Sequence, residues 1–159
     1  MNRLFALLLG TLLLPAAHAF GTDQELLEAD QAFAMTVRAR DAGTIEASWK
    51  IADGYYMYRD KFVFESLDPG LTLKPAAIPP GKKKDDPGFG VVETYTRGVT
   101  VALPIERRDA TLNNARLRIT SQGCNEPIGV CYPPEVKEIT VALPPLKTVA
   151  VGSLKDLAG

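Results

Sequence analysis

The feature that most constrains the fold is a series of short runs in which apolar and polar residues alternate. Such alternation places apolar side chains on one face of a strand. The clearest runs have apolar residues at positions 45, 47, 49 and 51, at 99, 101 and 103, at 115, 117 and 119, and at 139, 141 and 143. Turn signals separate the runs: Asp41-Ala42-Gly43, Asp53-Gly54, Asp68-Pro69-Gly70, Pro79-Pro80-Gly81 and Arg108-Asp109. The pattern predicts an all-β fold, an immunoglobulin-like antiparallel β-sandwich, with a small β-barrel as the alternative.

One domain accounts for these runs, because no internal repeat and no second set of turn-punctuated strands is present. We expect the domain to cover residues 20–145 and to be followed by a tail or linker at 146–159. Trp49 lies on an alternating run and is predicted to be a core residue. Near the start of this domain, residues 25–28 have the composition of a single helical turn.

Residues 1–19 are predicted to be a secretory signal peptide. Arg3 supplies the positive charge, residues 4–14 form the apolar run, and Ala17-His18-Ala19 is a small-residue cleavage pattern. The apolar run is shorter than the roughly 20 residues that a membrane-spanning helix needs. We therefore expect cleavage before Phe20, export, and no direct membrane insertion of the mature chain.

Composition excludes several kinds of site. The only histidine is His18, which leaves with the signal peptide, so the mature chain has no imidazole for Ser-His-Asp catalysis, Cys-His catalysis or a zinc site. Two cysteines alone do not make a structural zinc site, and we expect neither a metal nor another cofactor. With 18 Lys and Arg against 19 Asp and Glu, the chain has no basic footprint for nucleic acid.

The two cysteines, Cys124 and Cys131, open and close the loop between two predicted strands, 115–121 and 136–143. Pairing of these strands brings the two sulfurs within bonding range. One interpretation is a structural staple in an exported protein, where so short a ring stabilises by roughly 2.5 kcal/mol. The other is a disulfide open to attack by a second thiolate. Six intervening residues are unlike the C-x-x-C redox spacing, so spacing and placement alone favour the structural staple and leave the redox interpretation open.

The cysteine loop and its flanks resemble the amino-terminal periplasmic domain of the DsbD family of thiol:disulfide interchange proteins. The matching segments are Asp30-Gln31-Ala32-Phe33, Asp53-Gly54-Tyr55-Tyr56-Met57-Tyr58-Arg59, Glu93-Thr94-Tyr95, Gln122-Gly123-Cys124 and Cys131-Tyr132-Pro133-Pro134-Glu135. They occur in the family's order and spacing over roughly residues 28–145. The cysteine loop is one residue longer than expected for the family.

This resemblance implies an immunoglobulin-like thiol:disulfide oxidoreductase that acts as an electron carrier in the periplasm. By the match, Cys131 forms mixed disulfides with partners and Cys124 resolves them. The implied electron donors are the thioredoxin-like and membrane domains of DsbD type. The implied acceptors are a periplasmic disulfide isomerase and a thioredoxin-like cytochrome c maturation protein. The alternative function is an immunoglobulin-like binding module whose disulfide is purely structural.

The resemblance also points to residues around the cysteines. Tyr56 and Tyr58 match tyrosines beside the disulfide, although packing at a strand end explains them equally well. Residues 82–90 fall where the family has a loop that caps the disulfide with an aromatic ring, and Phe89 is the aromatic residue available there. From composition alone this segment is predicted to be a solvated, charged turn, and the family's consecutive aromatic pair is Gly88-Phe89 here.

Carboxylates dominate the expected surroundings of the thiols. Glu126 and Glu135 flank the cysteines in the sequence, and Asp86 of the segment 82–90 is expected to lie near them. A nearby carboxylate disfavours a thiolate. We therefore expect a free thiol that reacts poorly until a partner docks. Because the sequence stops at Gly159, without the family's membrane and thioredoxin-like domains, we expect either a fragment or a stand-alone version that borrows its donor.

Overall fold

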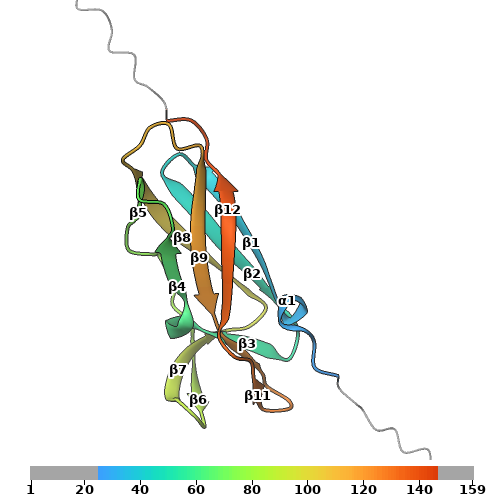
Figure 1. The fold of residues 1–159 in the computed structure, drawn as a ribbon. Coiled ribbons are helices and arrows are strands. Elements are labelled where there is room, and N and C mark those ends of the chain that lie inside the picture. Colours follow the sequence, from blue (N-terminus) through green and yellow to red (C-terminus); the bar gives the residue numbers. More distant parts are fainter. Residues whose placement is uncertain (1–24, 147–159) are drawn as a thin grey trace, which may run out of the picture.

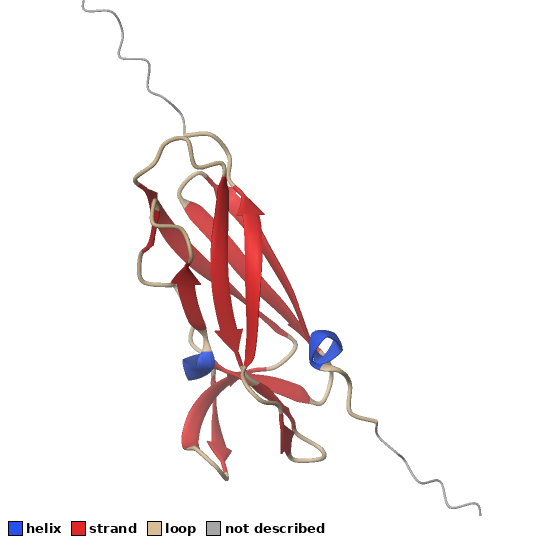
Figure 2. Cartoon of the chain, viewed as in Figure 1, coloured by secondary structure: helices blue, strands red, loops and turns tan. Residues whose placement is uncertain are grey.

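The structure, a computed structural model, describes residues 25–146 and is built almost entirely from short strands (Figure 2). A single α-helical turn, α1 (Ala29–Ala32), precedes the first strand, and a 3₁₀ turn, η1 (Arg59–Lys61), follows the third. The strands are β1 (Phe33–Asp41), β2 (Thr44–Ile51), β3 (Tyr55–Tyr58), β4 (Val63–Ser66), β5 (Leu71–Leu73), β6 (Lys82–Asp86), β7 (Gly90–Tyr95), β8 (Gly98–Arg107), β9 (Asn114–Ser121), β10 (Gly123–Asn125), β11 (Val130–Cys131) and β12 (Glu135–Ala142). None of the helices in residues 25–146 has the length and apolar character needed to cross a bilayer.

Two antiparallel sheets form the body of the molecule. One has the strand order β1-β2-β8-β5, and the other has the order β12-β9-β4. In Figure 1 the second sheet lies in front of the first, and the long strands of the first sheet cross behind those of the second at an angle. A third sheet, β11-β10-β3-β7-β6, extends beyond one end of this sandwich (Figure 1). The predicted immunoglobulin-like sandwich is therefore confirmed, and the barrel alternative is not what the chain forms.

The core lies between the two sheets because the alternating residues point inward from both. Along β2 the residues Ile45, Ala47, Trp49 and Ile51 are all buried, as the alternation predicts. The ring of Trp49 crosses the layers, with its centroid 4.6 Å from that of Phe62 and 6.4 Å from that of Phe64 on β4. Burying an aromatic residue of this size contributes several kcal/mol to the free energy of unfolding, and its predicted core position is confirmed.

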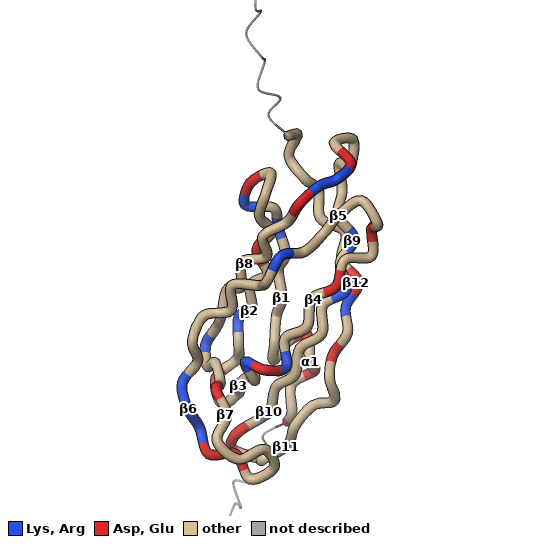
Figure 3. The backbone as a smooth tube through the Cα atoms, turned by 90° about the vertical axis from the view of Figure 1, so that its left-hand side faces the viewer, with Lys and Arg blue, Asp and Glu red and all other residues tan. Residues whose placement is uncertain are grey.

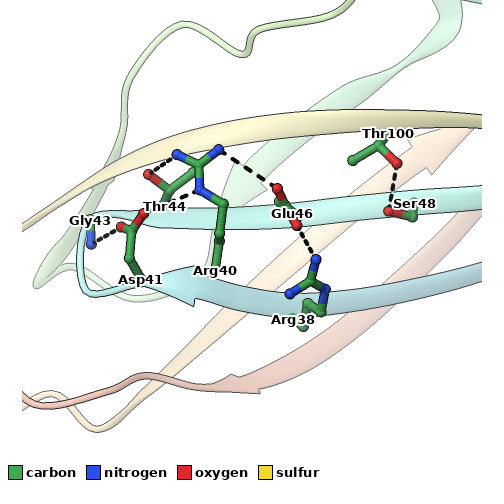
Figure 4. A network of polar contacts seen from close by, with 8 residues as sticks. All are labelled: Arg38, Arg40, Asp41, Gly43, Thr44, Glu46, Ser48 and Thr100. Carbon is green, nitrogen blue, oxygen red and sulfur yellow. Dashed lines mark hydrogen bonds and ion pairs between the residues drawn. The ribbon is translucent and has the colours of Figure 1, made fainter.

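The opposite face of β1, β2 and β8 is polar. Figure 4 shows Arg38 and Arg40 reaching Glu46 across the strands, and Ser48 hydrogen-bonded to Thr100 at 2.9 Å. The Asp41-Ala42-Gly43 signal makes the tight turn between β1 and β2, where the amide of Gly43 donates to the Asp41 carboxylate. Such exposed ion pairs contribute little to stability, so this face marks the solvent side of the sheet.

Three sequence expectations need correction. The helical turn lies at Ala29–Ala32, one turn later than residues 25–28, because Glu28 precedes the helix and its amide donates to Gln31. Strand β1 was not among the predicted runs, although its residues alternate in burial. Residues 82–86, predicted as part of a charged turn, form strand β6 against β7, and only 87–89 turn. The signal peptide lies outside the described residues, as does the tail from 147 onward.

Candidate functional site

The third sheet brings the two cysteines and the predicted tyrosines together at one end of the sandwich. Strand β10 is central to this arrangement, because Cys124 pairs with Cys131 on one side and with Tyr56 of β3 on the other. The Asp53-Gly54 turn delivers β3 to this position, and Gly54 has a φ of +80°, which favours glycine. Segments that are about seventy residues apart in the sequence therefore share one small sheet.

Cys124 and Cys131 are joined by a disulfide, but their two sulfurs are in different surroundings. Cys124 is only 1% exposed and packs with Tyr56 and Tyr58, whereas Cys131 is an exposed residue on the edge strand β11. Backbone contacts hold the ends of the loop together, since the amide of Tyr132 donates to the carbonyl of Gly123 at 3.0 Å. The predicted hairpin with a cysteine at each end of its loop is confirmed by this register.

A hydrogen-bonded cluster of two phenols and one carboxylate lies against the disulfide. The hydroxyls of Tyr58 and Tyr56 both donate to Asp86 Oδ2, at 2.6 Å and 3.0 Å. Tyr58 Oη is also 3.2 Å from Cys124 Sγ and 3.7 Å from Cys131 Sγ. Because the proton of Tyr58 is directed to Asp86, the phenolic oxygen presents its lone pairs to the sulfurs.

The local chain fixes Asp86 in place at the end of β6. Its second oxygen, Oδ1, accepts the amides of Gly88 at 2.8 Å and Phe89 at 3.1 Å, which forms the tip of the β6–β7 hairpin. The hydrogen bond from Tyr58 holds the pKa of Asp86 below its usual value, opposed by burial. Burial first, and then the Asp86 carboxylate, raise the pKa of Tyr58 well above its usual value, and burial raises that of Tyr56. The cluster therefore consists of one carboxylate and two neutral phenols near pH 7.

Acid should weaken the fold partly through Asp86. A carboxyl group whose pKa is lowered by folding stabilises the folded state above its unfolded pKa of about 3.9, and this contribution is lost as the pH falls through the folded value. We expect Asp86→Asn to lower the free energy of unfolding by about 1 kcal/mol at pH 7 and to make stability less dependent on pH below about 4. Denaturant unfolding at several pH values measures both, with the exposed neighbour Asp85→Asn as the matched control. Equal acid dependence in wild type and Asp86→Asn would contradict the assignment.

The β6–β7 hairpin, residues 82–95, is called here the cap hairpin. At its tip Phe89 packs edge-on against Tyr58, with ring centroids 5.4 Å apart, and the ammonium of Lys61 lies 4.7 Å from the Phe89 centroid. Phe89 is itself 52% exposed. A groove of about 450 Å³ runs between this tip and the loop 125–130, and both Phe89 and Cys131 line it. The structure thus places Phe89 in the same groove as Cys131, packed on the tyrosine whose hydroxyl lies near both sulfurs.

Most of the predicted surroundings are brought together at this site. Tyr56, Tyr58, Asp86 and Phe89 all lie there, and the packing interpretation of the two tyrosines holds at the same time, because both are buried. Glu135 is instead directed to Lys137 at 3.2 Å.

The sequence did not predict a role for Lys84, which bonds to Glu126 at 2.5 Å and lies over the ring of Tyr56. Figure 3 shows the basic residues along β6, and a run of three lysines in the sequence gave no signal that the third is half-buried.

Comparison with known sequences finds one protein family over most of the chain. The family model described as thiol:disulfide interchange protein DsbD, N-terminal, matches residues 23–143. A curated DsbD of Actinobacillus pleuropneumoniae serotype 5b is 35% identical over 146 residues, which are 90% of this chain and 24% of the relative. A DsbD of Ralstonia nicotianae is 36% identical over 159 residues, 95% of this chain and 25% of the relative. The chain therefore spans about a quarter of the length of these relatives.

Solved structures give the same result for the fold. The DsbD N-terminal domain of Neisseria meningitidis in its reduced form superposes with a TM-score of 0.64 at 36% identity, covering 74% of this chain and 90% of that one. A second structure, of the complex between the Neisseria DsbD N-terminal domain and the PilB N-terminal domain, has a TM-score of 0.61 at 34% identity, covering 73% and 87%. The likeness thus covers about three quarters of the chain and supports the immunoglobulin-like fold.

Proposed function

The chain belongs to the family of DsbD N-terminal domains, and on that premise we propose that it carries electrons by thiol–disulfide exchange through Cys124 and Cys131. A disulfide that joins these two residues supports exchange chemistry at this pair.

The observation that carries the division of roles is the difference in exposure between the sulfur-bearing residues. Thiol–disulfide exchange needs the attacking thiolate to approach in line with the bond that breaks, so the attacked sulfur must be accessible. Cys131 is exposed on an edge strand, and Cys124 is 1% exposed beneath Tyr56 and Tyr58. Cys131 is therefore the residue that bonds to partners, and Cys124 is the residue that resolves the bond.

The reaction in the reducing direction has two steps. The Cys131 thiolate attacks one sulfur of a partner disulfide, and the other partner sulfur leaves as a thiolate that takes up a proton. The Cys124 thiolate then attacks Cys131 Sγ, which releases the second partner thiolate and restores the Cys124–Cys131 disulfide. Two electrons pass to the partner, and the two protons of the dithiol balance the two new partner thiols.

Tyr58 and Asp86 bias the resting state of the dithiol. With its own proton directed to Asp86, the oxygen of Tyr58 accepts a hydrogen bond from a Cys124 thiol at the observed 3.2 Å. A lone pair and a carboxylate near the sulfurs disfavour the thiolate form. The free dithiol is then slow to react with unselected oxidants, and reaction depends on a partner that changes these surroundings.

Proteins with the thioredoxin fold are the proposed partners. The structure of the Neisseria DsbD N-terminal domain with the PilB N-terminal domain supports a protein partner for this kind of domain. The proposed donors are thioredoxin-like and membrane domains of DsbD type. The proposed acceptors are a periplasmic disulfide isomerase and a thioredoxin-like cytochrome c maturation protein. The proposed compartment is the periplasm. Residues 1–19 are proposed to direct export of the chain as a signal peptide and to be cleaved from it.

The reduction potential of the disulfide distinguishes this function from a structural staple in a binding module. The chain is equilibrated in glutathione redox buffers, quenched with acid and alkylated. Mass spectrometry then gives the number of alkylated thiols. We expect a potential near or above about −230 mV, in the range of exchange-active disulfides, whereas structural disulfides lie below about −300 mV. A value in that lower range would favour the binding module over the electron carrier.

A further inference from the structure

Glu126 occupies a special position because it lies inside the loop that the disulfide closes. It directly follows the last residue of β10, and its backbone amide donates to the carbonyl of Gly54 at 2.8 Å. Its side chain extends away from the loop and accepts from Lys84 Nζ at 2.5 Å. Glu126 therefore ties the loop between the two cysteines to a different element, the cap hairpin.

Lys84 is held at its end of this contact by two features. It lies on β6 with the ammonium 4.8 Å from the ring centroid of Tyr56, a cation–π contact, and its side chain is 26% exposed. Its neighbour Lys83 is exposed, since successive residues of a strand face opposite sides. Of the three lysines on β6, Lys84 is the half-buried one, and its ammonium bonds to the cysteine loop at Glu126.

The tie matters most once the disulfide is reduced. Cys124 is buried in β10 and fixed by pairing with β3, whereas Cys131 belongs to a two-residue edge strand that pairs only with β10. Reforming the bond requires Cys131 Sγ to stay near Cys124 Sγ, and the equilibrium depends on the effective concentration of one thiol at the other. A contact that restrains the connecting loop raises that concentration.

We propose that Lys84 is a positioning residue for the exchange reaction, which through Glu126 holds the cysteine loop against the cap hairpin and keeps Cys131 close to Cys124 in the dithiol. The proposal deepens the proposed function, because it concerns the stability of the same disulfide. It does not require any partner protein, and it holds for exchange with a small dithiol.

The test is the equilibrium with dithiothreitol, measured for wild type, Lys84→Met, Glu126→Gln and the double variant. In this reaction the Cys124–Cys131 disulfide and reduced dithiothreitol give the protein dithiol and cyclic oxidised dithiothreitol, so two electrons and two protons are transferred. Dithiothreitol buffers titrate a structural disulfide as well, so the test works whichever way the glutathione measurement turns out. Lys83→Met is the matched control on the same strand, and thermal unfolding of each variant checks the fold.

We expect each single variant to shift the equilibrium towards the dithiol by about two- to fivefold, in keeping with the strength of a partly exposed ion pair. The double variant should shift no further than either single one, and high salt should shift wild type in the same direction. Opposite shifts in Lys84→Met and Glu126→Gln would show that Lys84 acts by its charge on a thiolate and would overturn the proposal. Additive shifts, or shifts no larger than that of Lys83→Met, would overturn it too.

Discussion

Replacing Cys131 by serine is expected to reduce thiol–disulfide exchange with a thioredoxin-like domain to the background rate. A hydroxyl does not attack a disulfide under these conditions, and the remaining thiol, Cys124, is buried beneath Tyr56 and Tyr58. The measurement follows the loss of free thiols from the reduced chain and their appearance in the oxidised domain. Samples are quenched with acid, labelled with a maleimide and separated by gel electrophoresis. No other single substitution is expected to reduce the first step of exchange as strongly.

The control for this prediction is the matching substitution at the other sulfur. Cys124→Ser leaves Cys131 free to attack, so it should consume partner disulfide but stop at the mixed disulfide. Both variants lose the same covalent ring, and so any general loss of stability is common to them. Equal loss of the first step in both variants would argue that the difference in exposure does not determine the roles.

Gly123→Ala should destabilise the fold and displace the site together. An added Cβ would lie 2.5 Å from the Phe33 ring and from the backbone oxygen of Tyr56. Phe33 has little room to move, because its ring packs edge-on against Tyr55 and Tyr132. Strand β10 must then shift away from β3, and Cys124 shifts with it.

We expect this variant to lose about 1–3 kcal/mol of unfolding free energy, the usual cost of overpacking, or roughly 4 °C in Tm for each kcal/mol. The rate of thiol–disulfide exchange by this variant should also fall, even at a temperature where the variant is fully folded. Gly43→Ala is the control, since its Cβ meets only Asp41 Oδ1 at an ordinary 3.7 Å. A variant as stable as Gly43→Ala would refute the close approach of β10 to β3.

Alternation along the strands was enough to predict the sandwich and the cysteine hairpin. The inward residues of β2, β8 and β9 are buried as the pattern requires, and β9 and β12 pair with each other on either side of the cysteine loop. The prediction succeeds because a strand with one buried face must have an apolar residue at every second position. Assigning chemistry to the hairpin needed more than periodicity, and the family resemblance supplied it.

The sequence did not predict the cap hairpin, because the structure of this hairpin depends on tertiary contacts. Lys82–Asp86 carries only charged residues, which is the composition of a solvated turn, yet it pairs with β7 and delivers Asp86 to two buried phenols. Its inward residues, Lys84 and Asp86, are paired with Glu126 and with the tyrosines. No local sequence pattern predicts hydrogen-bond partners that are 28 to 42 residues away in the chain.

The central claim, that Cys131 is the sulfur that meets partners and Cys124 the one that resolves them, is tested most directly by trapping the intermediate. Reduced Cys124→Ala is mixed with an oxidised thioredoxin-like domain, quenched with acid, digested without reduction and mapped by mass spectrometry. The predicted result is a mixed disulfide between Cys131 and one partner cysteine that persists, whereas Cys131→Ala accumulates none. A stable adduct on Cys124 in the Cys131→Ala variant, with none on Cys131 in its counterpart, would contradict the account.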